Sequence, residues 1–277
     1  MYQKTEYAET SLVALRQLIR DNSLGQITTA IAADGFPLIQ STHIPWIVAV
    51  DDEASETDKG RLLGHMAKSN PQVKAMIQSV EGQPTDVPGV SVLKDEVLVV
   101  FTSNVQHYVT PKFYTESKPT TAKVVPTWNY ATVHVRGKAT IYVGGGPPAA
   151  ASTNAAANAY LEKQLDLLSE HGERALMDYT GEGGRPEPWK VADAPTNYLD
   201  IMRKSIIGIE IEITELVGKV KMSQEMRAGD RAGVIKGFGQ LGTDIGNAMS
   251  ALVDEKDKAM TAAKAAKAAG GAAAGEA

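Results

Sequence analysis

The stretch from Ile207 to Thr214 reads Ile-Gly-Ile-Glu-Ile-Glu-Ile-Thr, with an isoleucine at every second position. Successive side chains of a β-strand point to opposite faces of the sheet. This period of two therefore predicts a strand with one apolar face and one polar face. It is the cleanest strand pattern in the chain, and it requires a fold built around a sheet.

Other segments predict further strands and several helices. The strands are expected at residues 27–31, 38–44, 61–66, 96–101 and 133–143, and the helices at 11–21, 71–77, 153–170, 198–204 and 230–241. Asp34-Gly35 is a favoured hairpin turn between the first two strands. Residues 83–94 are expected to form an exposed insertion, residues 105–117 to be irregular, and the Gly/Pro run at 144–148 to end a strand. Because most strands pair locally and helices lie at the ends and between the halves, we predict an antiparallel α+β barrel with peripheral helices.

Composition excludes several classes of protein. The 277 residues carry a net charge of −5 and include no cysteine, which rules out disulfides, thiol catalysis and Cys-ligated zinc. No long basic run is present, so direct nucleic-acid binding is not expected. The N-terminus lacks the apolar region of a signal peptide, and no stretch approaches eighteen apolar residues. We therefore expect a cytoplasmic protein that does not enter a membrane.

The stretch from Val124 to Arg136 places Trp128, Asn129 and Tyr130 side by side before a strand of alternating residues. A cluster of aromatic and amide side chains at a strand entrance could hold a flat polar ligand. On the residues alone the simpler alternative is that Trp128 is a core residue and Asn129 a turn residue, since buried tryptophan is common.

The segment from Gly64 to Pro71 brings a lysine, a hydroxyl, an amide and a helix N-terminus within a few residues. A phosphate group binds such a combination of positive charge, neutral donors and free backbone N–H groups. The same segment could also be an ordinary strand-to-helix connection, with Ser69 or Asn70 as the N-cap.

Three histidines are possible metal ligands because each lies near a predicted strand. His43, His65 and His134 each lie in or beside a predicted strand, and three such residues could form an open zinc site. No close pair such as His-x-x-x-His is present, so we expect no metal. The sequence also contains no convincing nucleophile motif.

Five segments, taken together, resemble the PaiB family of FMN-binding split-barrel proteins. They are Thr42-His43-Ile44-Pro45, Gly64-His65-Met66-Ala67-Lys68-Ser69-Asn70-Pro71, Tyr108-Val109-Thr110-Pro111 with Phe113-Tyr114, Val125-Pro126-Thr127-Trp128-Asn129-Tyr130 with Val133-His134, and Lys221-Met222-Ser223-Gln224. They occur in the family's order over residues 1–240. The resemblance implies that these residues form a split-barrel domain with helical additions. Residues 241–277 would then be a C-terminal helix and an Ala/Lys/Gly-rich tail that is solvated or disordered.

The resemblance implies an α+β fold with an antiparallel six-stranded split barrel, FMN as the cofactor, and a homodimer with flavin sites at the subunit interface. Lys68, Ser69 and Asn70 would hold the phosphate, and Trp128 and Asn129 would contact the isoalloxazine ring or a substrate. The cofactor-binding residues implied in this way are Thr42, His43, His65, Lys68, Ser69, Asn70, Trp128 and Asn129, and the substrate-binding residues are Tyr108, Tyr130, His134, Lys221 and Gln224.

The family label defines the fold better than the reaction. The first hypothesis is an FMN-dependent oxidoreductase acting on a small molecule, with the flavin carrying the electrons. The second is a regulator of transcription, as the family's name implies, acting through a partner or a metabolite because the chain lacks a DNA-binding signature. The third is a haem-handling split barrel.

Overall fold

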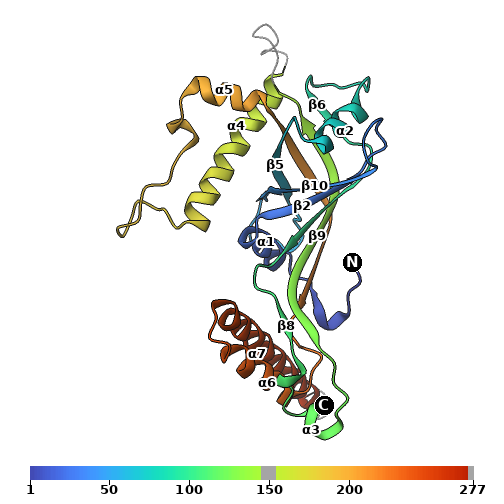
Figure 1. Cartoon of the computed structure of the whole chain (residues 1–277), viewed down its shortest axis with the longest axis vertical. Helices are drawn as coiled ribbons and strands as arrows, with labels where there is room; N and C mark the ends of the chain where they lie inside the picture. The colour runs from blue at the N-terminus through green and yellow to red at the C-terminus, as the bar shows by residue number, and fades with distance from the viewer. Residues whose placement is uncertain (145–153, 274–277) are drawn as a thin grey trace. The chain divides into compact units, whose positions relative to one another are not determined.

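The computed structural model describes residues 1–144 and 154–273, so most of the predicted Gly/Pro break lies outside the described residues. The described chain divides into two compact units (Figure 1). The first unit comprises residues 1–9, 102–132 and 218–277, and the second comprises residues 10–101 and 133–217. Each unit is therefore assembled from segments that are distant in the sequence.

One antiparallel sheet contains most of the strands, in the order β3-β2-β7-β9-β10-β5-β4. Their bounds are β2 Leu24–Ala30, β3 Ile39–Pro45, β4 Ile47–Ala49, β5 Arg61–Ala67, β7 Val97–Thr102, β9 Thr127–Tyr142 and β10 Ile206–Lys221. Three shorter strands pair off this path: β1 Ala8–Glu9 with β10, and β6 Val90–Val92 and β8 His107–Val109 with β9. The antiparallel α+β prediction is confirmed, but the sheet has ten strands and not six.

The predicted isoleucine strand is the centre of the second unit's core. Ile207, Ile209 and Ile211 are fully buried on one face of β10, which pairs antiparallel with β5. Gly208 is required between them, because a Cβ there would lie 2.3 Å from the ring of Tyr160. The ring of Tyr160 stacks on Tyr142 with centroids 4.0 Å apart. Small residues on this part of the sheet thus make room for aromatic rings.

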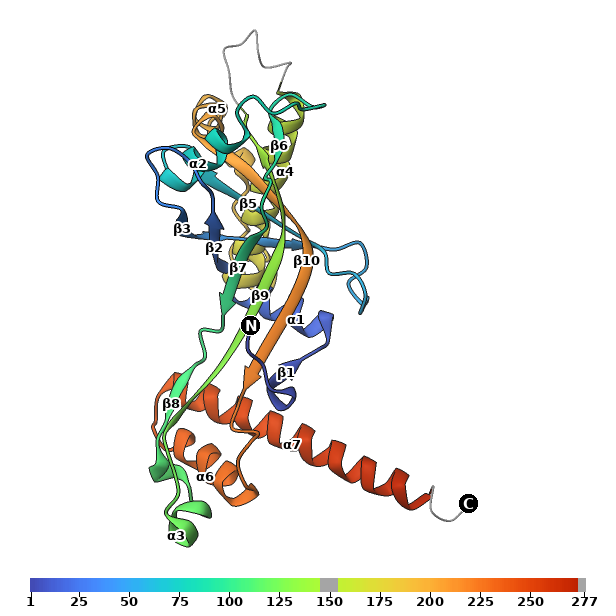
Figure 2. The ribbon, with the colours of Figure 1, turned by 90° about the vertical axis from the view of Figure 1, so that its right-hand side faces the viewer.

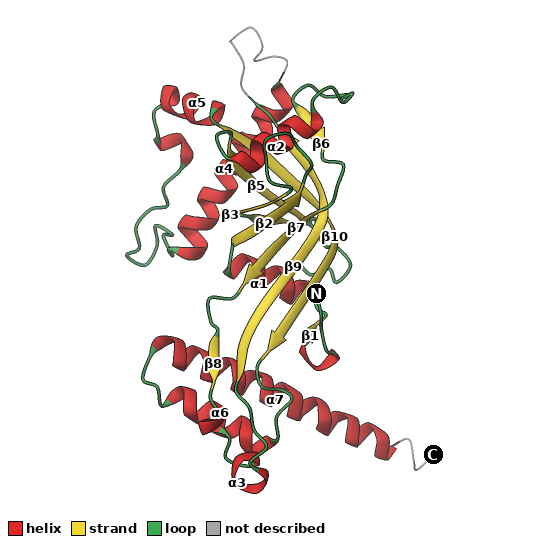
Figure 3. Ribbon diagram, turned by 45° about the vertical axis from the view of Figure 1, so that its right-hand side comes forward, coloured by secondary structure: helices red, strands yellow, loops and turns green. Residues whose placement is uncertain are grey.

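Four α-helices of the described residues accompany the sheet of the second unit, and none of them lies beyond the middle of β9 and β10 on the right of Figure 3. They are α1 Leu12–Asp21, α2 Pro71–Val80, α4 Ala155–Glu170 and α5 Thr196–Lys204. Ser11 caps α1 by accepting a hydrogen bond from the Ala14 amide at 3.2 Å. The helices α1 and α4 both contact β4, and α4 also contacts β5. All four helices agree with the predicted segments to within a few residues.

The first unit joins β1 and β8 to the helices α3 Ser117–Thr121, α6 Ala228–Gly239 and α7 Asp244–Ala273 (Figure 2). Val234 and Phe238 of α6 are fully buried, as are Met249 and Val253 of α7. These four apolar side chains show that α6 and the first half of α7 share a core. Alanines 262 and 263 of α7 are exposed, in agreement with a solvated end of the helix.

Several boundaries differ from the prediction. The strand β4 was not predicted, and β8 lies within a segment that was expected to be irregular. The strand β9 begins at Thr127 and β10 ends at Lys221, so both are longer than predicted, and Trp128 lies inside a strand rather than before one. The predicted insertion at 83–94 is mostly exposed but contains β6.

Candidate functional site

The segment from Gly64 to Pro71 leads from β5 into α2, as the sequence predicts. Asn70 is the N-cap of α2, because its side chain accepts a hydrogen bond from the Gln72 amide at 2.9 Å. Pro71 follows at the first helical position, where a missing N–H costs nothing. This segment is therefore a strand-to-helix connection with an N-cap. That finding does not exclude a phosphate at the same place, so phosphate binding stays a prediction.

Two hydrogen-bonded side chains attach this helix start to the neighbouring strands. The Nδ2 group of Asn70 donates to Oγ1 of Thr42 on β3 at 3.1 Å. The buried Gln72 donates to Oγ1 of Thr29 at 3.0 Å and to the Gln40 carbonyl at 3.2 Å. The structure thus brings Thr42 and Asn70 together from segments that are 28 residues apart.

Lys68 is a half-buried cation in this region. Its Nζ donates to the Gly144 carbonyl at 2.6 Å, and it forms no ion pair with any described residue. Burial without a neighbouring negative charge lowers the pKa of Lys68 below its ordinary value of 10.5. An ammonium group carries three donors. The group therefore has donors to spare and would gain from an incoming anion, which is the property that a phosphate-binding lysine needs.

The predicted histidines of the second unit occupy different surroundings. His43 lies exposed on β3, whereas His65 lies half-buried on β5. The Nδ1 of His65 lies 2.8 Å from Oε1 of Gln164 on α4, a buried partner that the sequence did not indicate. Burial lowers the pKa of His65, so the neutral ring is favoured. Ser69 is exposed next to Lys68.

The tryptophan of the first unit is not a core residue. Trp128 is 46% exposed and Tyr108 is 45% exposed. They are directly opposite each other in the pairing of β8 with β9, and their rings make an edge contact at 6.4 Å. The alternative that Trp128 is a core residue is therefore wrong, and a flat ligand at this exposed pair of rings stays a prediction.

The amide of Asn129, in contrast, is fully buried and already paired. It exchanges hydrogen bonds of 3.0 and 3.1 Å with the hydroxyl of Ser223, which lies within one of the motifs of the resemblance. Lys221 donates to Thr127 at 2.6 Å and to the Trp128 carbonyl at 3.1 Å. These contacts fix the backbone beneath Trp128.

The remaining predicted substrate residues are spread over both units. Gln224 donates to the Val220 carbonyl at 2.6 Å and so closes the turn after β10. In the first unit, the Tyr130 ring lies beneath the ammonium of Lys219, 5.3 Å from the ring centroid. In the second unit, His134 is half-buried on β9, and burial lowers its pKa. A role for these residues in binding a substrate stays a prediction.

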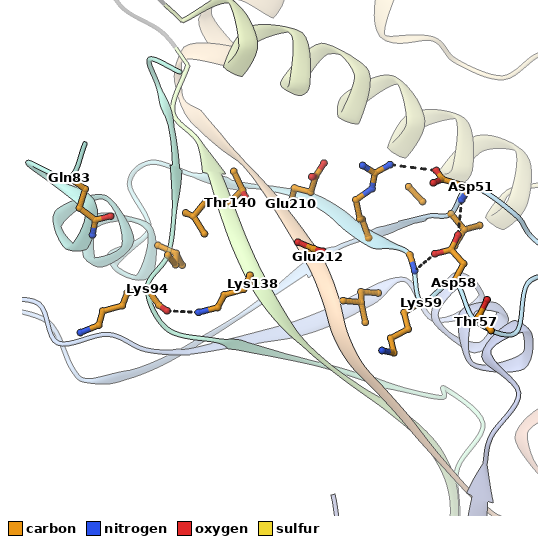
Figure 4. Close-up of a pocket in the computed structure, with 17 residues that line it drawn as sticks. Asp51, Thr57, Asp58, Lys59, Gln83, Lys94, Lys138, Thr140, Glu210 and Glu212 are labelled. Atoms are coloured by element: carbon orange, nitrogen blue, oxygen red, sulfur yellow. Dashed lines mark hydrogen bonds and ion pairs between the residues drawn. The ribbon is translucent and has the colours of Figure 1, made fainter. Parts of the chain in front are cut away.

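A wide trough of about 1090 Å³ lies elsewhere on the second unit (Figure 4). Glu210 and Glu212 of β10 lie in it, with Lys94 and Lys138 to one side. The charges in the trough are of both signs, and Nζ of Lys138 donates to the Lys94 carbonyl at 2.6 Å. No residue predicted for the cofactor lines it. A phosphate would meet carboxylates here, so the surroundings of Lys68 suit an anion better.

Membrane insertion by a helix has no support in the described residues. None of the helices within residues 1–144 and 154–273 combines the length and the apolar character that a transmembrane segment requires.

Comparison with known proteins identifies the family. The family model described as "Putative FMN-binding domain" matches residues 1–215. An uncharacterized protein of Aspergillus fumigatus is 46% identical over 264 residues, which are 92% of this chain and 97% of the relative. The "Protease synthase and sporulation protein PAI 2" of Bacillus subtilis is 24% identical over 258 residues, or 93% and 99% of the two chains.

Among solved structures, the FAD and heme binding protein from Mycobacterium smegmatis aligns with a TM-score of 0.41 and 12% identity, covering 78% of this chain and 73% of that one. The family model covers well over half of the chain, and the resemblance to PaiB is confirmed. The protein belongs to the FMN-binding domain family, whose cofactor is FMN.

Proposed function

We propose that this protein is an FMN-dependent oxidoreductase that acts on a small molecule and holds the flavin phosphate with Lys68, Ser69 and Asn70. The observation that supports this assignment is that the ammonium group of Lys68 lacks a negatively charged partner among the described residues. Its ammonium is half-buried, donates to one carbonyl oxygen and has no carboxylate partner among the described residues. A desolvated cation without a counter-charge is costly, and an anionic ligand removes that cost.

The neighbouring groups suit a phosphate as well. The hydroxyl of Ser69 is exposed, so it can donate to a ligand oxygen. Asn70 holds the start of α2 through its side-chain oxygen and Thr42 through its side-chain nitrogen. Because Thr42 accepts from Asn70, its own O–H is left to donate. We propose that these residues bind and orient the phosphate end of the cofactor.

Bound FMN would supply the electron transfer to and from the substrate. The protein's contribution is to bind and orient. His43 follows Thr42 on β3, so the two side chains point to opposite faces of the sheet, and the position of His43 along the ribityl chain stays a prediction. Trp128 and Tyr108 offer an exposed aromatic surface in the first unit. Their part in the flavin site, and the homodimer that would create it, remain predictions.

A regulatory role is the second candidate. The relative from Bacillus subtilis is named for protease synthesis and sporulation, and the match covers 99% of its length. In a regulator of this family the flavin would act as a sensor, and the chain would act on transcription through a partner or a metabolite.

Anaerobic reoxidation kinetics distinguish the two functions. The FMN-loaded protein is photoreduced without air and mixed with a panel of quinones, nitro compounds and azo compounds. An oxidoreductase should reoxidise with at least one acceptor faster than free reduced FMN does at the same concentration. Bound flavin that is protected from every acceptor, or that cannot be reduced, would contradict the oxidoreductase and favour the sensor.

A further inference from the structure

A crevice between α4 and the chain that leads to α5 contains none of the residues of the family resemblance. After α4 the chain turns through a short helical segment, η4 His171–Leu176, and returns toward α5 (Figure 1). The crevice has a volume of about 350 Å³, at the small end of the usual range for ligand sites. Its lining comprises Asp166, Ser169, Glu170, Arg174, Pro188, Trp189, Lys190, Val191 and Ala192.

Trp189 forms one wall and is held there by its backbone. Its amide donates to Oε2 of Glu173 at 3.0 Å, and its carbonyl accepts from the Ser169 hydroxyl at 3.2 Å. The residue is nevertheless 48% exposed, between the buried Pro188 and Val191. An indole ring that is half-exposed on a fixed backbone adds little to the core. It does provide a flat apolar surface for a ligand.

The charged residues of the crevice balance one another but are poorly paired. Asp166 and Glu170 lie one turn apart on α4, and Arg174 and Lys190 supply two positive charges. Arg174 and Glu170 are 3.8 Å apart and largely exposed, which makes their ion pair weak. Asp166 and Lys190 form no side-chain ion pair with any described residue. Groups of both signs therefore remain for a ligand that carries both charges.

We propose that this crevice binds a free amino acid with an aromatic side chain. The aromatic ring packs on Trp189, the ammonium group meets Asp166 and Glu170, and the carboxylate meets Arg174 and Lys190. The small volume fits a metabolite rather than a macromolecule, and the balanced charges select a zwitterion over a simple amine or acid. Such a site would let the concentration of an amino acid act on the protein independently of the flavin.

Isothermal titration calorimetry on the full-length, FMN-loaded protein tests this with three related probes. The probes are L-phenylalanine, phenethylamine, which lacks the carboxylate, and 3-phenylpropionate, which lacks the ammonium. We expect L-phenylalanine to bind about three- to fivefold more tightly than either, since the charged groups of the crevice are exposed and an exposed ion pair has roughly that effect. Equal affinities for the three probes, or no saturable heat with L-phenylalanine at millimolar concentration, would overturn the proposal.

Variants then assign each contact. Asp166→Asn should weaken L-phenylalanine and phenethylamine by about three- to fivefold and leave 3-phenylpropionate unchanged. Arg174→Gln should weaken L-phenylalanine and 3-phenylpropionate to a similar extent and leave phenethylamine unchanged. Trp189→Leu should weaken all three probes. Glu182→Gln, an exposed carboxylate in the same connection, is the matched control and should change nothing. FMN content should be equal in all variants. If Asp166→Asn binds L-phenylalanine as tightly as the wild type does, the proposed contact between Asp166 and the ammonium group is wrong.

Discussion

Replacing Lys68 should weaken the binding of FMN, which carries a phosphate, more than the binding of riboflavin, which does not. In Lys68→Met the apolar stem stays but the ammonium is lost, together with its 2.6 Å hydrogen bond to Gly144. A charge-assisted hydrogen bond contributes roughly 1.5–3 kcal/mol. Lys68 is only half-buried, so we expect its contact with the phosphate to contribute about 2 kcal/mol to FMN binding, in the lower half of that range. This corresponds to a roughly thirtyfold weaker FMN complex, since each 1.4 kcal/mol is a factor of about ten.

Riboflavin provides the internal comparison because it lacks the phosphate. Its Kd should change by less than about threefold in Lys68→Met, as expected when no charged contact is lost. Flavin fluorescence titrations of both ligands measure the two affinities. Lys74→Met replaces an exposed lysine on α2, the helix that follows Lys68; it is the matched control and should leave both affinities unchanged. Equal losses for FMN and riboflavin would refute the phosphate assignment, as would an unchanged FMN affinity.

The pH dependence gives a second test of the same residue. Burial lowers the pKa of Lys68 below 10.5, and only its protonated form attracts a phosphate. FMN affinity should therefore fall as the pH rises through the lowered pKa, before an ordinary lysine would titrate. Riboflavin affinity should not follow this curve, and neither should FMN affinity in Lys68→Met.

Three further predictions concern the framework around the site. Burial lowers the pKa of His65, so protonation of this side chain favours the unfolded chain. The free energy of unfolding should therefore decrease as the pH falls from 6.5 toward the lowered pKa of the folded state. In urea melts at pH 5 to 7, His65→Asn should make this decrease smaller. Gly208→Ala should cost about 1–3 kcal/mol, because the new methyl group meets the ring of Tyr160, whereas Gly172→Ala has open space and should change the melting curve little. Trp128→Ala should cost less than the roughly 3–5 kcal/mol of a core tryptophan, since the ring is 46% exposed, and a larger loss in thermal melts would return it to the core.

Local patterns in the sequence predict the framework well. The alternation of Ile207 to Ile213 is set by one buried face, and the N-cap at Asn70 by its own backbone, so both could be predicted without knowing the rest of the fold. The strand β8 could not, because His107 to Val109 is too short to show a period and pairs with residues about twenty positions later. The count of six strands came from the family resemblance and missed these short pairings.

Long-range contacts define the candidate site, and no local pattern reveals them. The amide of Asn129 was predicted to contact a ring, yet it pairs with Ser223, which is 94 residues away. The isolation of Lys68 from carboxylates depends on which segments surround it, and its carbonyl partner lies 76 residues further along the chain. Sequence reasoning could therefore name the residue types a phosphate needs, but only the fold shows which of them are still unpaired.

The visible absorption spectrum of the purified protein, taken after incubation with FMN and gel filtration, tests the central claim most directly. We predict the two absorption bands of an oxidised flavin in the protein peak, at one FMN per chain, and a much smaller retained fraction for Lys68→Met. A protein peak without flavin bands after saturation with FMN, or one with a Soret band in their place, would contradict an FMN-binding site at Lys68.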